Sequence, residues 1–211
     1  IGTHNLICVF YNGQFVLAQY GSCDGYPKGQ GLEIVKFLKN PGNIQRLKDG
    51  LNHTFKVSDE VAYVAKRQIN NLRGLERLAW DAFIKLKNPL VTIEVIRHLR
   101  PSLHGSTGAG ILKIVAQAWE LQKVPIKFDL SFAADWVYCK WAYVIDLDGE
   151  VLEVFRGSTQ KTPDHRLKDV GEDSDSVPAL ISSFSFSELE EMKGGNGFLK
   201  RVNDSLYEEI M

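Results

Sequence analysis

The chain has 211 residues, 44% of them hydrophobic and 24% charged, which is enough to bury a full core and fits a single domain over residues 1–211. Its 25 basic and 26 acidic residues give a formal charge of -1, so no summed field would draw it to nucleic acid or to an anionic membrane. The longest apolar runs fall far short of the roughly 20 residues that a membrane-spanning helix needs.

The N-terminal stretch predicts a β-hairpin followed by a shaped loop. Leu6–Tyr11 and Gln14–Tyr20 flank Asn12-Gly13, the dipeptide that best tolerates the positive φ angles of a type I′ turn. The next segment, Gly21–Gly31, holds four glycines and one proline, and we expect no regular structure in it.

Helical patterns fill the middle of the chain. The apolar positions after Leu32 predict a helix that stops at Asn40-Pro41-Gly42, and a second short helix is expected over Ile44–Leu51. Later helices are expected over three segments: from Ser58 or Asp59 to Leu86; Val91–Leu99, where a strand is the alternative; and Ser106–Leu121. Extended structure is expected after Pro125.

The remainder predicts a second hairpin, a last strand and two helices. Trp141–Leu147 and Glu150–Phe155 flank Asp148-Gly149, another favoured tight-turn dipeptide. After an exposed loop over 158–177, the expected elements are a strand over Leu180–Phe186, a helix with a capping box at Ser187 and Glu190, and a helix over Phe198–Ile210. The class predicted is α+β, with a mainly antiparallel sheet of hairpins packed against helices.

The glycine-rich loop is the first candidate ligand site. It places Asp24, Tyr26, Lys28 and Gln30 within one turn-rich stretch, and its glycines let a ligand approach the backbone closely. The loop ends at a predicted helix N-terminus, where free N–H groups favour anions. A purely structural strand-to-helix connection, in which Asp24 and Gln30 bond only to the loop itself, has equal weight.

The segment Phe132–Trp141 is the second candidate site. It places Asp135 and Cys139 four residues apart beside several aromatic residues, Trp141 among them, which is a composition typical of pockets. A nucleophilic Cys139 would need a lowered pKa, whereas a buried and inert cysteine is the more common case. Asp135 and Cys139 are the catalytic candidates here, and Trp141 is a ligand-binding candidate.

A glycine-containing stretch, His104–Gly110, resembles a phosphate-binding loop because its glycines precede a predicted helix. It lacks the lysine of a P-loop and a clear strand before it. Capping of the helix by Ser106 or Thr107 is therefore the preferred interpretation.

Metal and cofactor sites are not indicated. The five histidines are scattered, the three cysteines form no CxxC, and the acidic residues near the second hairpin lack the order of a calcium loop. We expect no metal and no cofactor. Unpaired cysteines, with no secretory signal in the first residues, favour a cytoplasmic protein.

Two resemblances cover much of the chain. An uncharacterised family of fungi, bacteria and phages has a similar Gly-Thr start, an Ala-Gln-Tyr…Asp-Gly-Tyr-Pro-x-Gly-Gln-Gly loop and a Phe-Ala-Ala-Asp…Cys-x-Trp-Ala-Tyr-Val-Ile-Asp-Leu-Asp segment. These motifs match at Gly2-Thr3, Ala18–Tyr20, Asp24–Gly31 and Phe132–Asp148. That resemblance implies no established activity.

The order of the two hairpins also resembles the N-terminal-nucleophile hydrolases, of the proteasome type. In that family a Gly–Thr bond is cut to free a catalytic threonine, whose amine then acts as the base. The resemblance implies that Thr3 is the nucleophile of an amide-bond hydrolase. The chain departs from the family at Gln19, where an acid is expected, and the expected lysine is unassigned between Lys28 and Lys36.

Two functions remain open at the level of sequence. The first is a domain with a small-molecule or peptide-sized pocket, formed by Gly21–Gly31 and Asp135–Trp141, which is an amide-bond hydrolase or an inactive relative of one. The second is a non-catalytic protein-interaction or assembly module, whose aromatic residues bury a partner surface. A homo-oligomer is compatible with both.

Overall fold

A computed structural model of the chain describes residues 2–57, 101–135, 137–157, 165–170 and 178–208. In this part, five strands form one mixed sheet with the order β2-β1-β5-β6-β7. The strands are β1 (Asn5–Tyr11), β2 (Gln14–Gly21), β5 (Trp141–Asp146), β6 (Val151–Arg156) and β7 (Ala179–Ser185). The predicted α+β class, with a mainly antiparallel sheet, is confirmed.

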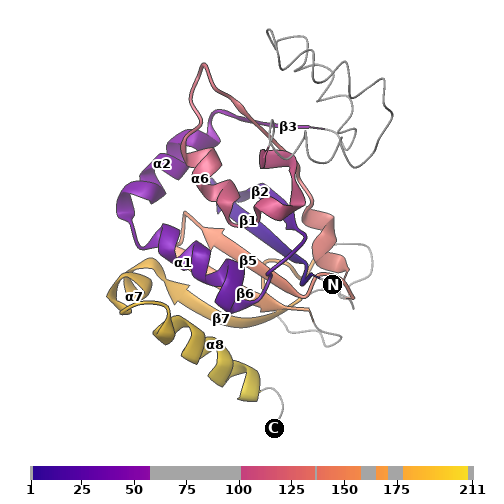
Figure 1. Cartoon of the computed structure of the whole chain (residues 1–211), viewed down its shortest axis with the longest axis vertical. Coiled ribbons are helices and arrows are strands. Elements are labelled where there is room, and N and C mark those ends of the chain that lie inside the picture. Colours follow the sequence, from indigo (N-terminus) through magenta and orange to yellow (C-terminus); the bar gives the residue numbers. More distant parts are fainter. Residues whose placement is uncertain (1, 58–100, 136, 158–164, 171–177, 209–211) are drawn as a thin grey trace.

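The two predicted hairpins are neighbours in this sheet. β1 pairs parallel with β5, from Asn5 opposite Trp141 to Phe10 opposite Asp146, whereas the other pairings are antiparallel. Their turns therefore lie at the same end of the sheet. Residues that precede β1 and β5 meet at the other end, together with the segment that follows β2 (Figure 1).

The first hairpin turn has the predicted type I′ conformation. Asn12 has a φ of 53° and Gly13 a φ of 75°, and Tyr11 pairs with Gln14 across the turn. Positive φ at both central residues matches the right-handed twist of the strands.

The second turn differs from the prediction. β5 ends at Asp146 and β6 begins at Val151, and the positive φ, 53°, belongs to Glu150. The Oδ1 atom of Asp146 accepts the N–H groups of Asp148 and Gly149, each at 2.9 Å, and so widens the turn. Gly149 is needed for space, because a Cβ there would lie 2.8 Å from Oδ2 of Asp146.

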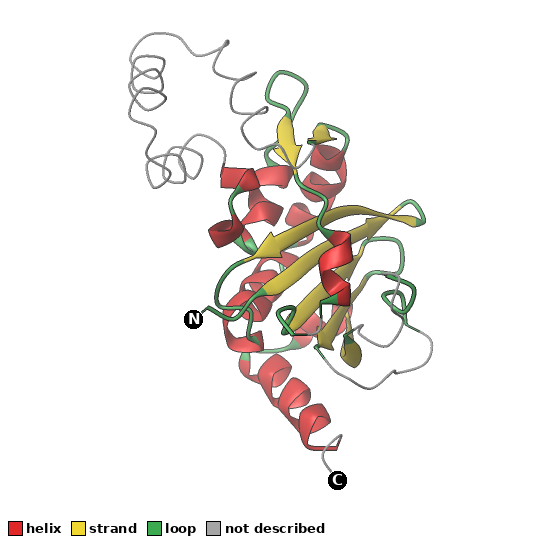
Figure 2. Cartoon of the chain, turned by 90° about the vertical axis from the view of Figure 1, so that its right-hand side faces the viewer, coloured by secondary structure: helices red, strands yellow, loops and turns green. Residues whose placement is uncertain are grey.

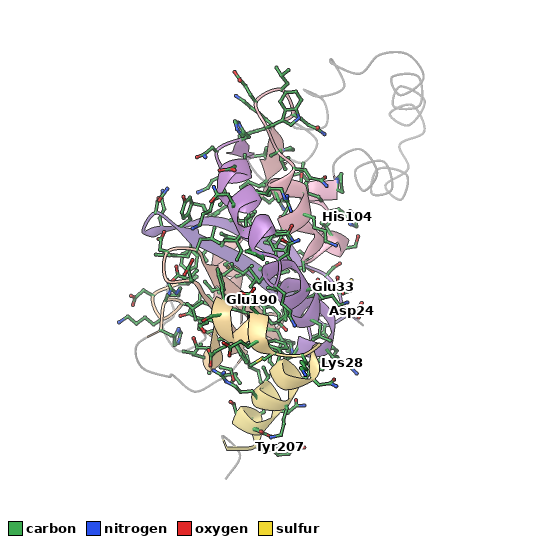
Figure 3. The ribbon with its side chains drawn as sticks, turned by 90° about the vertical axis from the view of Figure 1, so that its left-hand side faces the viewer. Asp24, Lys28, Glu33, His104, Glu190 and Tyr207 are labelled. Atoms are coloured by element: carbon green, nitrogen blue, oxygen red, sulfur yellow. The ribbon has the colours of Figure 1, made fainter. Side chains whose placement is uncertain are left out.

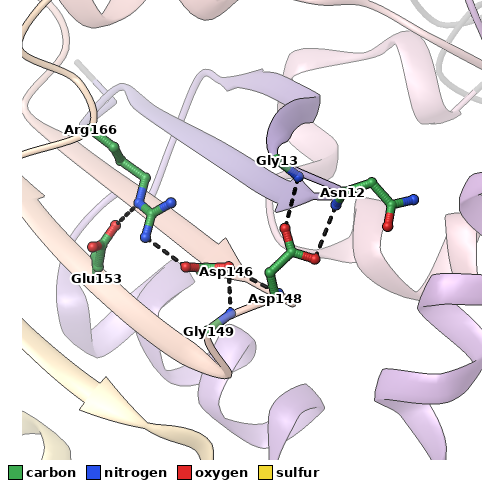
Figure 4. Close-up of polar contacts among 7 residues, drawn as sticks. All are labelled: Asn12, Gly13, Asp146, Asp148, Gly149, Glu153 and Arg166. Carbon is green, nitrogen blue, oxygen red and sulfur yellow. Dashed lines mark hydrogen bonds and ion pairs between the residues drawn. The ribbon is translucent and has the colours of Figure 1, made fainter.

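An acid in this second turn ties the two hairpins together. The carboxylate of Asp148 accepts the N–H of Asn12 at 3.0 Å and the N–H of Gly13 at 2.9 Å (Figure 4). Beside it, Arg166 contacts Asp146 and Glu153, both at 2.6 Å. These contacts fix the turn end of the sheet.

Helices cover one face of the sheet (Figures 1 and 2). They are α1 (Leu32–Leu38), α2 (Pro41–Leu51), α6 (Gly110–Ala116), α7 (Phe186–Glu191) and α8 (Asn196–Glu208). Alternate strand residues such as Ile7, Tyr143 and Val154 are fully buried in the core beneath them. The two-residue period of the strands thus places the larger core on this helical face.

The other face carries a smaller core. Leu6, Cys8, Val144 and Phe155 point to this face and are fully buried. They are covered by the short helix η4 (Leu130–Ala134) and by Leu167, so both faces of the central strands are buried.

Several predicted boundaries are wrong for local reasons. The predicted irregular loop contains one helical turn, η1 (Pro27–Gly31), and α2 begins at Pro41 because Asn40 caps it. The predicted helix over Ser106–Leu121 shortens to α6: it starts after Gly108, which has a positive φ of 52°, and it ends at Ala116. The turn before α6, η3 (Gly105–Thr107), is capped by the side chain of His104.

The capping box near the C-terminus lies two residues earlier than predicted. Ser185 and Glu188 form it, with bonds of 3.1 and 2.7 Å, and this choice lets Phe186 and Leu189 face the core. Two short strands, β3 (Thr54–Lys56) and β4 (Val124–Ile126), pair in parallel beside the main sheet. The helices predicted within 58–100 lie outside the described residues.

None of the described helices has both the length and the apolar character that crossing a membrane requires.

Candidate functional site

The glycine-rich loop folds tightly against the start of β1. The N–H of Gly25 donates to the carbonyl of Thr3 at 2.9 Å, and the hydroxyl of Tyr143 donates to the carbonyl of Gly25 at 2.7 Å. A Cβ on Gly25 would lie 2.8 Å from the Thr3 carbonyl oxygen, so this contact needs glycine. Burial raises the pKa of Tyr143 well above its ordinary value, which keeps the phenol neutral as a donor.

A side-chain amide joins this loop to a second glycine-containing loop. Oε1 of Gln30 accepts the N–H of Ala109 at 2.7 Å, and its Nε2 donates to the carbonyl of Cys23 at 3.4 Å. The carbonyl of Cys23 also accepts Nδ2 of Asn5 at 3.1 Å. Gln30, predicted to bind a ligand, therefore holds together two segments of the fold.

A groove opens between the glycine-rich loop and α8, on the helical face of the sheet. It has a volume of about 330 Å³, and we call it the α8 groove. Its lining residues are Tyr26, Pro27, Lys28, Trp141, Leu199, Asn203 and Leu206. Three of the five predicted ligand-binding residues, Tyr26, Lys28 and Trp141, thus come together here.

The α8 groove has an apolar floor and a cationic rim. Trp141 is 7% exposed at the first position of β5, and Leu199 and Leu206 lie about two turns apart on α8. Lys28 is exposed, with Nζ 5.9 Å from the centre of the Tyr26 ring, and Figure 3 shows it beside the first turns of α8. Among the described residues, no carboxylate pairs with Lys28.

A second cleft lies on the other face of the sheet. It has a volume of about 360 Å³, and we call it the aromatic cleft. It is lined by Tyr20, Lys127, Phe128, Asp129, Ser131, Phe132 and Asp135. Tyr20 belongs to β2 and the other lining residues belong to the segment around η4, so strand and covering segment each supply one wall.

The predicted single pocket is therefore divided between two clefts on opposite faces. Tyr20 pairs with Leu6, whose side chain lies in the smaller core, whereas Trp141 packs in the helical-face core. Asp135 lines the aromatic cleft, while Tyr26, Lys28 and Trp141 line the α8 groove. Asp24 lines neither cleft; it is exposed, with a positive φ of 51°.

Two of the catalytic candidates, Asp135 and Cys139, contact each other through the backbone. Cys139 is fully buried, and its burial, followed by the charge of Asp135, raises the pKa of its thiol to about 12. That setting favours the neutral thiol of a packing cysteine over a nucleophile. Asp135 uses its backbone carbonyl to accept the N–H of Cys139, and its Oδ1 to accept the N–H of Tyr138 at 3.2 Å.

Thr3 lies two residues before β1 and lines neither cleft. Its nitrogen is joined to Gly2, which packs against the loop so closely that a Cβ on Gly2 would lie 2.4 Å from the Ser22 carbonyl oxygen. The hydrolase interpretation needs a free amine at Thr3. A catalytic Thr3 stays a prediction.

Sequence reasoning missed most of the aromatic cleft and one wall of the α8 groove. The missed residues are Tyr20, Lys127, Phe128, Asp129, Ser131 and Phe132 in the first, and Pro27, Leu199, Asn203 and Leu206 in the second. The alternation of polar and apolar residues in Lys127–Phe132 was a usable signal. No local sequence pattern indicated that α8 lies beside Lys28.

Comparisons with protein-family models, with curated proteins and with solved structures find no match for this chain.

Proposed function

We propose that the protein is a non-catalytic ligand-binding domain whose α8 groove takes up a small amphipathic carboxylic acid. One observation carries this proposal: an apolar floor at Trp141 lies beside Lys28, a cation that has no carboxylate partner among the described residues. An apolar chain or ring would rest on the floor, and its carboxylate would accept hydrogen bonds from Nζ of Lys28 and from the Asn203 amide.

The size and lining of the groove support a small ligand over a protein partner or a substrate. A volume of about 330 Å³ is at the lower end of small-molecule pockets. The lining residues include no serine, threonine, cysteine, histidine or carboxylate, so the commonest catalytic nucleophiles and bases are missing from the groove. Retention of a ligand, without conversion, is the function that this lining favours.

The test is calorimetric titration with octanoate, with octan-1-ol as the neutral control of similar length. We expect octanoate to bind and Lys28→Met to weaken it at least about tenfold, because a charge-assisted hydrogen bond contributes about 1.5 to 3 kcal/mol and about 1.4 kcal/mol is a factor of ten. Binding of the alcohol should be weak in both proteins.

Lys140→Met is the matched control. Lys140 is exposed and adjacent in sequence to Trp141, but it does not line the groove. Equal losses in the Lys28 and Lys140 variants would show a general charge effect and would contradict the proposal. If a peptide bound through its C-terminal carboxylate and octanoate did not bind, the ligand would be a peptide and the proposal of a small acid would be wrong.

A further inference from the structure

We propose that the aromatic cleft binds an organic cation, a methylated ammonium group, independently of the α8 groove. The two clefts lie on opposite faces of the sheet and share no lining residue. The inference therefore stands on other observations than the function proposed above.

Aromatic rings form the walls of the cleft. Tyr20 and Phe132 meet edge to face, with their ring centres 5.0 Å apart and an interplanar angle of 84°. His4 packs edge to face on Tyr20, at 5.6 Å, and so supports its ring. The faces of such rings attract a methylated ammonium ion, because an aromatic ring carries its negative charge on the face and its positive charge at the edge.

The tyrosine of this wall stays uncharged. Burial, then the charge of Asp129, then Cys23, raise the pKa of Tyr20 above its ordinary value. The ring therefore acts as a neutral aromatic surface, and the negative charge of the cleft comes from carboxylates.

One carboxylate of the cleft is available to a cation. Oδ1 of Asp129 lies 3.9 Å from Nζ of Lys127, and its Oδ2 accepts the N–H of Tyr20 at 3.3 Å. Asp135, by contrast, accepts the Tyr138 N–H on its Oδ1 and forms no ion pair among the described residues. Its charge is left to attract a positively charged ligand.

The chain itself already places an ammonium on an aromatic ring of this cleft. Nζ of Lys56 lies 3.7 Å from the centre of the Phe128 ring. That ring is thus occupied, and Tyr20 and Phe132 remain for the ligand. Lys56 and Lys127 carry like charge, so a compact cation held close to Asp135 fits better than a chain of several positive charges.

The experiment compares choline with 3,3-dimethylbutan-1-ol, a neutral molecule of nearly the same shape, by NMR titration of the full chain. We expect saturable shifts of the Tyr20 and Phe132 ring signals with choline, and binding of the alcohol at least about tenfold weaker. An ion binds an aromatic wall through its charge as well as its methyl groups, and the alcohol has only the latter.

Two variants remove the charge and the ring face in turn. Asp135→Asn keeps an oxygen to accept the Tyr138 N–H, and Phe132→Leu keeps an apolar side chain; each should weaken choline binding at least about fivefold. Asp24→Asn and Phe55→Leu, at exposed positions outside the cleft, are the matched controls and should bind choline as the parent does.

Equal binding of choline and the alcohol would overturn the proposal, as would unchanged affinity in both Asp135→Asn and Phe132→Leu. Octanoate titrations of the same variants separate the two proposals. Loss of choline binding with octanoate affinity retained would assign the cation to the aromatic cleft alone.

Discussion

At the scale of the residue, Asp148 is the group whose chemistry joins the two hairpins. Its two carboxylate oxygens accept the N–H groups of Asn12 and Gly13 from the neighbouring turn. The hydrogen bond from Gly13, followed by that from Asn12, lowers the pKa of this carboxyl below its ordinary value. The interaction favours the ionised form, which ties its contribution to pH.

We expect Asp148→Asn to lower the urea midpoint at pH 7, because an amide offers one acceptor where two N–H groups point. Since the folded pKa lies below the unfolded one, the carboxylate stabilises the fold above about pH 4 and loses this effect as pH falls through the folded pKa. The difference between the variant and the parent should therefore shrink in acid. Glu150→Gln, in the same turn, is the control. If it lowered the urea midpoint as much as Asp148→Asn does, the stabilising role of the Asp148 carboxylate would be contradicted.

At this scale the sequence predicts local backbone conformation better than it predicts which distant residues contact each other. Asn12-Gly13 was recognisable as a turn because its φ angles are a local property. That Asp148 bonds to this turn depends on the parallel pairing of β1 with β5, which joins residues more than 130 positions apart. Tyr26 and Lys28 were predicted as ligand-binding from their place in a glycine-rich loop, and Trp141 from the composition of its segment. No local sequence pattern indicated that they meet α8.

At the scale of the element, the contact that matters most for the sites is the one between the two glycine-containing loops. The side chain of Gln30 crosses from η1 to the segment before α6, and Gly108 leaves it room, since a Cβ there would lie 2.3 Å from Oε1 of Gln30. η1 carries Pro27 and Lys28 of the α8 groove. The hydrogen bond between Gln30 and Ala109 therefore positions one wall of that groove.

We expect Gln30→Met to destabilise the protein by about 1 to 3 kcal/mol, because it leaves the buried N–H of Ala109 without an acceptor. Chemical denaturation measures the loss, and amide hydrogen exchange at Ala109 should become faster than in the parent. Gln45→Met, at an exposed position on α2, should cost less than about 0.5 kcal/mol. Unchanged exchange at Ala109 would show that Gln30 is not its protecting partner.

The bounds of helices and strands could be predicted where a local sequence rule determines them. They could not be predicted where several residues satisfy the same rule and tertiary packing selects one of them. The capping box illustrates this: Ser185 with Glu188 and Ser187 with Glu190 have the same spacing, and only the burial of Phe186 and Leu189 selects the first pair. In the same way, the helical pattern does not reveal that α6 starts only after Gly108, which has a positive φ and lies against Gln30.

At the scale of the whole molecule, one sheet separates two cores as well as two clefts. Leu6 and Ile7 are adjacent on β1, fully buried, and point to opposite faces, Leu6 to the smaller core and Ile7 to the helical-face core. Both cores contain side chains of the central strands β1 and β5. Unfolding of one core would displace these strands and so disrupt the other core.

A single cooperative domain is therefore expected. Leu6→Ala and Ile7→Ala should each cost about 2 to 5 kcal/mol, the range for truncating a buried aliphatic side chain. Each should shift one urea transition that circular dichroism and tryptophan fluorescence report at the same midpoint. A second transition, or a substitution that moves one signal and not the other, would mean that the smaller core under η4 unfolds apart from the helical face. The aromatic cleft would then belong to a segment that opens on its own, and its affinity for a cation would include the cost of ordering that segment.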